Sequence, residues 1–402
     1  MPRLLVENGL DGFLATSPEH VTYLTGYHSW TIYTFSAMEV YAVIAASGEK
    51  ALVVPVDALD FLVDRPADVD RVHVYGTFHI AWRAGTTLDG AERRLGQMRA
   101  DLPHHPSARA ALISALRELG LLNGRLGIDE TGLTPPRWRA LAETLPEAQL
   151  TERADLLRRA RVCKADSEVE LLRYAALAVE AGIQTAFAGC SAGDREVDLE
   201  RVIQSATAAA GVIPGHCETS LGTRSSACFP ATDRRLGPGD VIRSDCGGRY
   251  RGYWADTGRT AVLGDPPPVL KRCFDAISTG IDAMLVAIRP GLKVADLFDV
   301  AVGTVRDAGI PDYRRHHVGH GIGLEMYEAP LLVGATGSAD IHVAAPTPEL
   351  VEGMVLNIEL PYYELGLGGV QIEETLVVRS GGYDLLTSAP RGLFTVEADS
   401  VH

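Results

Sequence analysis

Hydrophobic positions with a helical period mark several segments of the chain. Between Val169 and Ile183, apolar residues recur at steps of three and four, which predicts an amphipathic helix. Ser167 and Glu170 have the spacing of a capping box, which favours a helix start at Ser167. Similar patterns predict helices over 111–122, 194–211 and 269–288, and a proline-led helix over 134–145.

Strand-like runs separate these helices and indicate two domains. The segment 40–56 contains two β-rich runs around Ser47 and Gly48, which predicts a hairpin. Beyond residue 160, most of the sequence outside the helices is strand-like, with turns at glycines. We therefore expect an α+β protein, with an N-terminal α/β domain over 1–155 and a catalytic domain over 160–402 in which helices cover a largely antiparallel sheet.

Two aspartates lie on a predicted hairpin in the catalytic domain. The turn is expected near Tyr250 and Arg251, and a hairpin centred there places Asp245 directly opposite Asp256. Opposed side chains on one face lie about 4.5–5.5 Å apart. Two carboxylates at this separation repel each other unless one is protonated or a cation lies between them.

A second predicted hairpin repeats this arrangement with glutamates. A turn over 366–368 makes Glu359 and Glu373 opposed partners, with Asn357 and Gln371 on the same face. The other face is apolar and suited to packing on helices. Each acid pair alone also fits a solvated strand face, whereas the two pairs together favour one site with four carboxylates.

His320 supplies a different kind of ligand between the two hairpins. It stands between Gly319 and Gly321, where the backbone can approach closely. A lone histidine of this kind is often structural, but four carboxylates with one neutral imidazole suit two divalent cations. The oxygen-rich set favours Mn²⁺, with Co²⁺, Fe²⁺ or Zn²⁺ as alternatives. Two ions about 3.5–4 Å apart can hold one hydroxide as nucleophile and polarise a carbonyl group.

Charge, apolar runs and cysteine content indicate which classes of partner and which cellular compartment to expect. The net charge of −15 argues against nucleic acid or an anionic membrane as partner. No stretch reaches the roughly 18 apolar residues that span a bilayer, and the first residues lack the apolar run of a signal peptide. Six cysteines, none of them in a C-x-x-C pair, suit reduced thiols. We expect a cytoplasmic protein.

Five ordered motifs resemble those of the pita-bread metallopeptidases. IRSDCGG, YWADTGRT, VGHGIGLE, LNIELPYY and VQIEET follow the ligand segments of this family, which includes Xaa-Pro dipeptidase, aminopeptidase P, methionine aminopeptidase and the metal-free creatinase. The first 155 residues, with ATSPEHVTYLTGY, are similar to a creatinase-type N-terminal domain. The resemblance thus covers nearly the whole chain and implies a homodimer.

The resemblance implies a role for each matching residue. Asp245 would bind one ion with both oxygens, Asp256 and Glu373 would bridge the two ions, and His320 and Glu359 would complete the second. Glu359 would also act as general base toward the water between the ions. His316 matches a histidine that binds substrate or steadies the tetrahedral intermediate, with an ordinary structural histidine as the alternative.

Three positions depart from the pattern of the proline-specific members. Cys228 or Phe229 stands where a histidine is usual before the first aspartate, Tyr327 replaces a second histidine, and Gln371 replaces an arginine. Tyr327 can still donate a hydrogen bond to an oxyanion, whereas Gln371 supplies no charge.

Two further interpretations concern residues outside the ligand set. Arg259 fits either a group that orients a substrate carboxylate or a structural salt bridge. An aromatic cluster in the N-terminal domain fits either core packing or a substrate entrance on a partner subunit, and consists of Trp30, Tyr33 and Phe35.

Three functions therefore stay open. The first is a two-metal hydrolase of small peptides, of the Xaa-Pro dipeptidase or aminopeptidase type. The second is a non-peptidase hydrolase or lyase acting on a small molecule, as in creatinase-like and dimethylsulfoniopropionate-lyase-like proteins. The third is a binding module without catalysis, which the complete ligand set disfavours.

Overall fold

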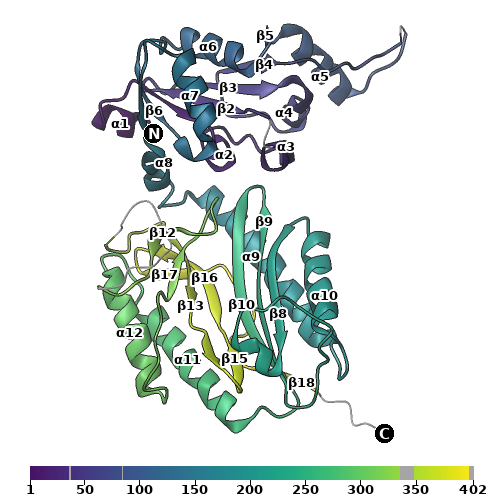
Figure 1. The fold of residues 1–402 in the computed structure, drawn as a ribbon, viewed down its shortest axis with the longest axis vertical. Helices are drawn as coiled ribbons and strands as arrows, with labels where there is room; N and C mark the ends of the chain where they lie inside the picture. Colours follow the sequence, from purple (N-terminus) through teal and green to yellow (C-terminus); the bar gives the residue numbers. More distant parts are fainter. Residues whose placement is uncertain (36–37, 84, 336–347, 398–402) are drawn as a thin grey trace. The chain divides into compact units, whose positions relative to one another are not determined.

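The computed structural model describes residues 1–35, 38–83, 85–335 and 348–397. Backbone contacts divide the chain into two compact units, Met1–Ala160 and Arg161–His402 (Figure 1). The side chain of Trp30 lies outside the described residues. No helix in the described ranges combines the length and the apolar character that crossing a membrane requires.

The first unit is built on a seven-stranded mixed sheet in the order β5-β4-β3-β2-β1-β6-β7. Its strands are β1 (Gly12–Ala15), β2 (Tyr41–Ala45), β3 (Lys50–Pro55), β4 (Arg71–Tyr75), β5 (His104–His105), β6 (Arg125–Ile128) and β7 (Gln149–Glu152). Its helices are α1 (Pro2–Glu7), α2 (Pro18–Thr25), α3 (Trp30–Thr34), α4 (Phe61–Asp64), α5 (Gly90–Asp101), α6 (Ala108–Glu118), α7 (Pro135–Thr144) and α8 (Ala154–Ala160). The antiparallel pairing of β2 with β3 confirms the hairpin predicted around Ser47 and Gly48.

The second unit contains two main sheets, in the orders β18-β10-β9-β8 and β12-β11-β13-β16-β17. The strands of the first sheet are β8 (Ile213–Leu221), β9 (Val241–Tyr250), β10 (Tyr253–Leu263) and β18 (Phe394–Val396). Those of the second are β11 (Gly319–Gly321), β12 (Glu328–Leu331), β13 (Val355–Glu359), β16 (Glu373–Arg379) and β17 (Gly382–Leu385), and a separate pair is β14 (Tyr362–Glu364) with β15 (Gly368–Val370). The predicted α+β architecture is confirmed.

Four long helices cover the outer faces of these sheets. They are α9 (Asp166–Gly189), α10 (Glu196–Ala209), α11 (Pro268–Ala287) and α12 (Val294–Asp307). Figure 1 shows α9 and α10 on the side of the first sheet and α11 and α12 on the side of the second. One apolar core joins α9 and α10 to β9 and β10, and another joins α11 and α12 to β13 and β16. With the helices outside, the inner faces of the sheets are left for polar groups.

The capping-box prediction placed the N-cap of α9 at Ser167, two residues after the observed N-cap Ala165. The helix begins at Asp166, and the Glu168 carboxylate accepts the Ala165 N–H at 2.9 Å. Ser167 therefore lies inside the first turn, and the predicted Ser167–Glu170 capping box is wrong. The remaining predicted helices are confirmed as α6, α7, α10 and α11.

The two acid-bearing hairpins differ in how well their register was predicted. Tyr250 pairs with Tyr253, so that the turn is Arg251-Gly252, where both residues have positive φ values of 50° and 92°. This turn pairs Asp245 with Gly258, and the expected direct pairing of the two aspartates is wrong; they are diagonal neighbours on one face. Glu359 and Glu373 do pair directly, as predicted.

Candidate metal centre

Five neighbouring strands supply the predicted ligands. Asp245 lies on β9, Asp256 on β10, His320 on β11, Glu359 on β13 and Glu373 on β16. All but Asp245 are buried, with side chains of opposite sheets directed toward one region between β10 and β16. Strand alternation explains this placement, because the residues next to the acids, such as Cys246 and Ile358, point into the two helix-covered cores.

Direct contacts connect these side chains in two groups, and Glu359 pairs with Glu373 across β13 and β16. His320 Nε2 is 3.4 Å from Asp256 Oδ2. The Gln371 amide donates to Asp245 Oδ2 at 2.9 Å and to Glu373 Oε1 at 2.5 Å. Asn357 donates to the other Glu373 oxygen at 3.2 Å. The structure thus brings the aspartates and glutamates of both hairpins together, as the sequence predicted.

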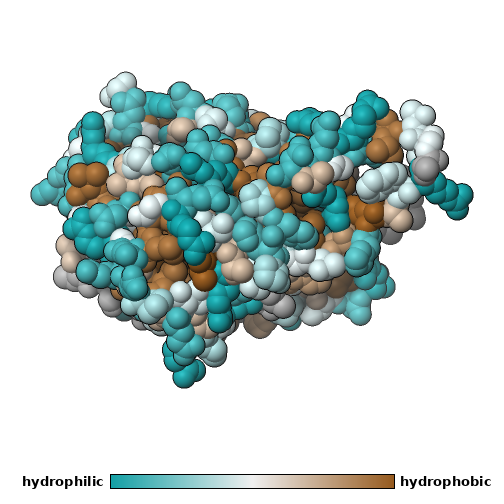
Figure 2. Space-filling view, turned by 90° about the horizontal axis from the view of Figure 1, so that it is seen from above, coloured by the Kyte–Doolittle hydropathy of each residue, from teal (hydrophilic) through white to brown (hydrophobic). Residues whose placement is uncertain are grey.

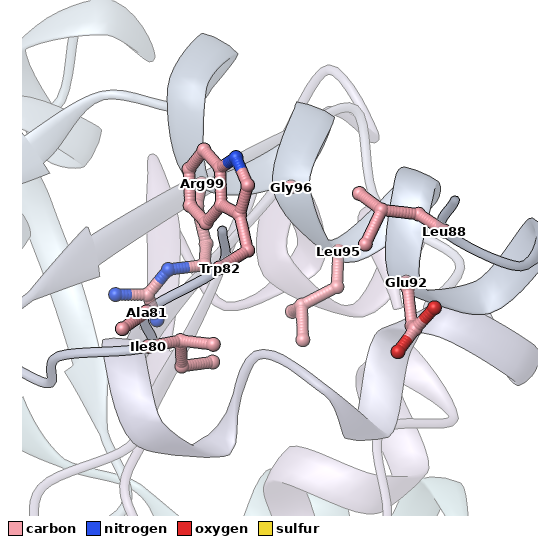
Figure 3. A pocket seen from close by; sticks show the side chains of 8 residues that line it. All are labelled: Ile80, Ala81, Trp82, Leu88, Glu92, Leu95, Gly96 and Arg99. Atoms are coloured by element: carbon pink, nitrogen blue, oxygen red, sulfur yellow. The ribbon is translucent and has the colours of Figure 1, made fainter. Parts of the chain in front are cut away.

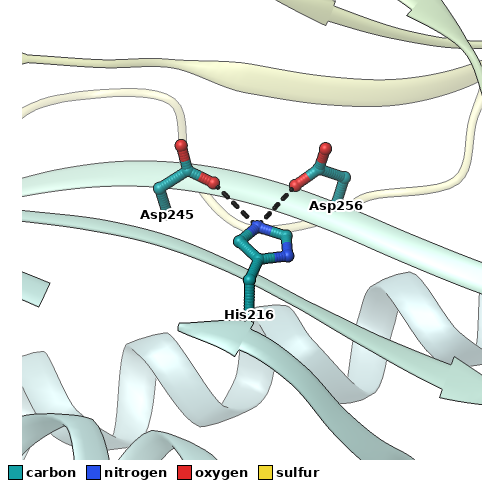
Figure 4. A group of neighbouring side chains, drawn as sticks. All are labelled: His216, Asp245 and Asp256. Atoms are coloured by element: carbon teal, nitrogen blue, oxygen red, sulfur yellow. Dashed lines mark hydrogen bonds and ion pairs between the residues drawn. The ribbon is translucent and has the colours of Figure 1, made fainter. Parts of the chain in front are cut away.

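His216 on β8 is a member of this cluster that the sequence analysis missed. Its Nε2 is 3.1 Å from an oxygen of Asp245 and 3.1 Å from an oxygen of Asp256 (Figure 4). Donor atoms of the three residues lie within 4.8 Å of one another. His216 lies 29 residues before Asp245 on a strand not assigned to the site, and its alternation with Glu218 on one strand face was the available signal.

Burial and the repulsion between neighbouring carboxylates shift the pKa values of the acids in this cluster. Burial and the neighbouring carboxylates raise the pKa of Glu373 well above its usual value. The pKa of Asp245 is also raised, by burial and by Asp256, despite its hydrogen bond with His216. Burial also acts on Asp256, but the imidazoles of His216 and His320 close to its carboxylate outweigh it and hold the pKa of Asp256 low. So many acids in one buried place require compensating positive charge.

The donor set fits divalent cations. His320 Nδ1 is 2.9 Å from the carbonyl oxygen of Gly321, which can only accept, so the proton resides on Nδ1. A neutral His320 then presents the lone pair of Nε2 to Asp256, and two acceptors face each other. Asp256 Oδ1 and His320 Nε2 both lack a hydrogen-bond partner among the described residues. A metal ion in this position would satisfy both atoms.

Two basic groups contact the carboxylate of Glu359. His317 Nδ1 is 3.0 Å from one Glu359 oxygen, and Arg315 donates to the other at 3.3 Å. Burial raises the pKa of Glu359, but these partners outweigh it and lower the pKa. His316, the histidine singled out from the sequence, is exposed, and its ring meets the edge of the His317 ring at 4.3 Å. The histidine that contacts a predicted ligand is therefore His317, which the sequence analysis did not single out.

Tyr327 stacks on His320, one of the predicted ligands. Its ring lies 3.8 Å from the His320 ring, nearly parallel to it. Burial raises the pKa of Tyr327, and the nearby carboxylates raise it further, so the phenol keeps its proton. A neutral hydroxyl beside the acid cluster is a hydrogen-bond donor for a developing negative charge.

Arg243, two residues before Asp245, supplies a guanidinium beside Gln371. It is fully buried and donates to Gln371 Oε1 at 2.8 Å and to the carbonyl oxygens of Ser225 and Ala227 at 3.1 Å each. Its Nη1 is 3.7 Å from Asp245. The positive charge absent at position 371 is thus delivered from β9, which the sequence analysis did not foresee.

Arg259 and Cys228 are engaged with protein groups. Arg259 Nη2 contacts the buried carboxylates of Glu180 at 2.7 Å and Glu374 at 3.0 Å, an arrangement typical of a structural ion pair. Burial and a hydrogen bond to Glu218 raise the pKa of the Cys228 thiol to about 11. Cys228 is therefore a neutral thiol near neutral pH.

A separate pocket lies in the first unit and is lined mainly by apolar residues. It is lined by the loop 80–82 and one face of α5 (Figure 3). Ile80 and Trp82 of this lining are exposed, as is the nearby Phe78. Figure 2 shows hydrophobic and hydrophilic residues mixed over one face of the molecule. Glu92 and Arg99 are the pocket's only charged lining residues among those described, so it lacks the donor set of the acid cluster.

Comparison with known families agrees with this arrangement of fold and site. The model of metallopeptidase family M24 matches residues 170–380, and that of the creatinase/prolidase N-terminal domain matches residues 2–163. Because the first match spans more than half of the chain, the protein belongs to the M24 metallopeptidase family. M24 is, as a family, one of dinuclear metal enzymes. The resemblance drawn from the five motifs is confirmed.

Individual relatives are similar at modest identity. An uncharacterized peptidase, YqhT, of Bacillus subtilis is 25% identical over 389 residues, which cover 96% of each chain. An Xaa-Pro dipeptidase of Pyrococcus furiosus is 28% identical over 242 residues, 60% of this chain and 67% of that protein. The crystal structure of dipeptidase PepE from Mycobacterium ulcerans superposes with a TM-score of 0.74 at 25% identity, covering 98% of this chain and 96% of that chain.

Proposed function

We propose that this protein is a two-metal-dependent peptidase that cleaves Xaa-Pro dipeptides or the N-terminal residue before a proline. The observation that carries the proposal is the convergence of two acid pairs, buried except for Asp245, and His320 on one place, where the repulsion among the carboxylates calls for cations. The Xaa-Pro dipeptidase among the relatives motivates the choice of substrate.

The five ligands of the proposal are those of the sequence analysis. Two divalent ions, with Mn²⁺ as first choice and Co²⁺, Fe²⁺ or Zn²⁺ as alternatives, would be held by Asp245, Asp256, His320, Glu359 and Glu373. When bound, such ions supply positive charge that makes a water molecule acidic and polarises a carbonyl group.

The chain's own residues then handle protons and charge. Glu359, held by His317 and Arg315, takes a proton from the attacking water and passes it to the departing amine. Tyr327 donates its hydroxyl proton in a hydrogen bond to the oxygen that becomes negative. His316 and Gln371 complete the substrate side in this proposal, and Arg259 serves there only through its contact with the Glu373 backbone.

A panel of Xaa-Pro dipeptides and longer Xaa-Pro peptides tests the proposal. Hydrolysis should require added Mn²⁺ or another divalent ion and should stop when the ion is chelated. A matched panel of Xaa-Ala peptides measures the preference for proline. Metal-dependent cleavage without that preference would support the proposal of a metal-dependent peptidase and contradict the proposed specificity for proline.

A second candidate is a non-peptidase hydrolase or lyase acting on a small molecule. The observation that favours it is the neutral character of the three altered positions, where Cys228 carries a protonated thiol, Tyr327 a phenol and Gln371 an amide. Full metal content without turnover of any peptide would select this candidate.

The proposal extends to compartment and assembly. We infer a cytoplasmic homodimer, because the family resemblance implies that an N-terminal domain of this type covers the partner subunit's active site. Molar mass from light scattering tests the dimer, and a mass of one chain would contradict it.

A further inference from the structure

His216 reaches the acid cluster through an irregularity in β8. The pairing of β8 with β9 runs from Pro214–Gly248 to Cys217–Cys246, so that Gly215 and His216 oppose the single residue Gly247. This is a β-bulge, a feature that bends a strand and redirects a side chain and is common beside active sites.

Gly247 makes room for the imidazole. It pairs with Asp256 on its other side, so that it lies between the strand of His216 and the strand of Asp256. A Cβ atom at position 247 would lie 2.5 Å from His216 Cε1 and 2.7 Å from Nδ1. Because this position carries no side chain, two groups from strands about 10 Å apart can meet above it.

The hydrogen bonds among His216, Asp245 and Asp256 leave one carboxylate oxygen without a donor. The single N–H at His216 Nε2 donates to Asp245 Oδ1. Asp256 Oδ1, at the same distance of 3.1 Å from Nε2, lacks a hydrogen-bond partner among the described residues. Separations of about 3 Å are also those between neighbouring ligands whose bonds to one metal ion are about 2.0–2.2 Å long. No described residue hydrogen-bonds to His216 Nδ1, so that nitrogen can carry the ring proton and leave the lone pair on Nε2.

We propose that His216 is a sixth protein ligand, which binds through Nε2 the ion that Asp245 and Asp256 hold. Each of the two ions then has one imidazole, from His216 and His320 respectively. An imidazole shifts the preference of an otherwise carboxylate site from Mn²⁺ toward Co²⁺, Fe²⁺ and Zn²⁺. This inference rests on the two-ion site of the proposed function but not on its peptide substrate.

Titration of the chelator-treated full-length protein with Co²⁺ and, separately, with Mn²⁺ tests this ligand. His216→Phe keeps a ring but removes the nitrogen, and His216→Gln is the second variant should the first fail to fold. His104→Ala, which removes an exposed histidine of the first unit, is the matched control. Calorimetry gives the stoichiometry and affinity, and the visible absorption of Co²⁺ reports its ligands.

The expected result is a selective loss at one of two ions. His216→Phe should lower the affinity for one of the two Co²⁺ ions by at least about tenfold, a change typical for residues that bind a metal ion or orient its ligands. It should weaken Mn²⁺ less, so that the Co²⁺-to-Mn²⁺ preference falls, and the Co²⁺ spectrum should change. His104→Ala should behave like the parent protein.

Two results would overturn the inference. Unchanged affinity and spectrum in both His216 variants would show that the imidazole is not a ligand. Tighter binding, or a rise from one ion to two, would show instead that a protonated His216 takes the place of an ion. Because no peptide is present in the titration, a failure of Xaa-Pro hydrolysis leaves either reading of His216 intact.

Discussion

At the scale of single residues, the position of Arg243 bears on the glutamine that stands at position 371 in place of the family's arginine. The Arg243 guanidinium places a positive charge beside Gln371, which has none. The Arg243 guanidinium binds the amide oxygen of Gln371 and thereby turns the amide nitrogen toward Asp245 and Glu373. The orientation of both carboxylates therefore depends on a residue that is not a predicted ligand. Sequence alone could not show this, because residues 243 and 371 meet only through the packing of two sheets.

Swapping the two residues tests this pair. Gln371→Arg places a second buried guanidinium beside Arg243, and Arg243→Gln removes the charge near Asp245; each should destabilise the protein by about 3–5 kcal/mol. The double variant should be more stable than the sum of the two changes predicts, by about 1–3 kcal/mol. Urea unfolding of the four proteins measures the difference. Strictly additive effects would mean that the two side chains do not compensate each other.

Tyr327 gives a second prediction at this scale. Tyr327→Phe preserves the stacking on His320 and removes the hydroxyl, so kcat for any cleaved substrate should fall about 100-fold while metal content stays the same. Tyr327→His should raise cleavage of Xaa-Pro dipeptides. A variant with phenylalanine that is as active as the parent would exclude the hydroxyl from catalysis.

At the scale of elements, the spacing of apolar residues was enough to predict the helices. The register of the hairpins was harder to predict, because it depends on the conformation of the turn residues. Apolar steps of three and four were sufficient for α9 to α11, and alternation was sufficient to place the acids on inner strand faces. The register of β9 with β10 was wrong by one position in the turn, because both Arg251 and Gly252 adopt positive φ and only glycine favours that conformation without a tertiary context. The bulge at Gly215 and His216 has no signature in a single strand, so β8, the second strand that brings an imidazole to the site, was missed.

The start of β12 offers a pH-dependent test. Glu328 is buried between Lys164, at 3.0 Å, and Arg161, at 3.6 Å. Burial raises its pKa, but the two cations outweigh it and lower the pKa. A carboxylate with a lowered pKa stabilises the native state above its unfolded pKa of about 4.3, and this contribution is lost as the pH falls through the native value.

Glu328→Gln should therefore lower the free energy of unfolding by about 3–5 kcal/mol at pH 7. The deficit relative to the parent protein should shrink as the pH is lowered below about 4, where the parent loses the same charge. Urea unfolding at several pH values measures it. A deficit that is constant with pH would mean that the charge of Glu328 does not contribute.

At the scale of the whole molecule, the catalytic unit alone contains every predicted ligand. Asp245 to Glu373 all lie within Arg161–His402, and the first unit contributes none of the residues joined by the contacts of the metal centre. Family motifs in the sequence were specific enough to predict two units and to single out five residues that the structure brings near one another. What the sequence could not predict is the set of groups that hold those ligands, because His317, Arg315, Asn357 and Arg243 carry no motif of their own.

Counting bound metal in Asp256→Ala and Glu373→Ala tests the central claim most directly. The family resemblance implies that each of these residues would hold both ions, so each variant, purified with excess Mn²⁺ and then desalted, should lose both ions and all hydrolytic activity. Cys228→Ser, which leaves the five ligands in place, should retain the parent's two ions per chain. Full metal content in either acid variant would contradict a shared dinuclear centre.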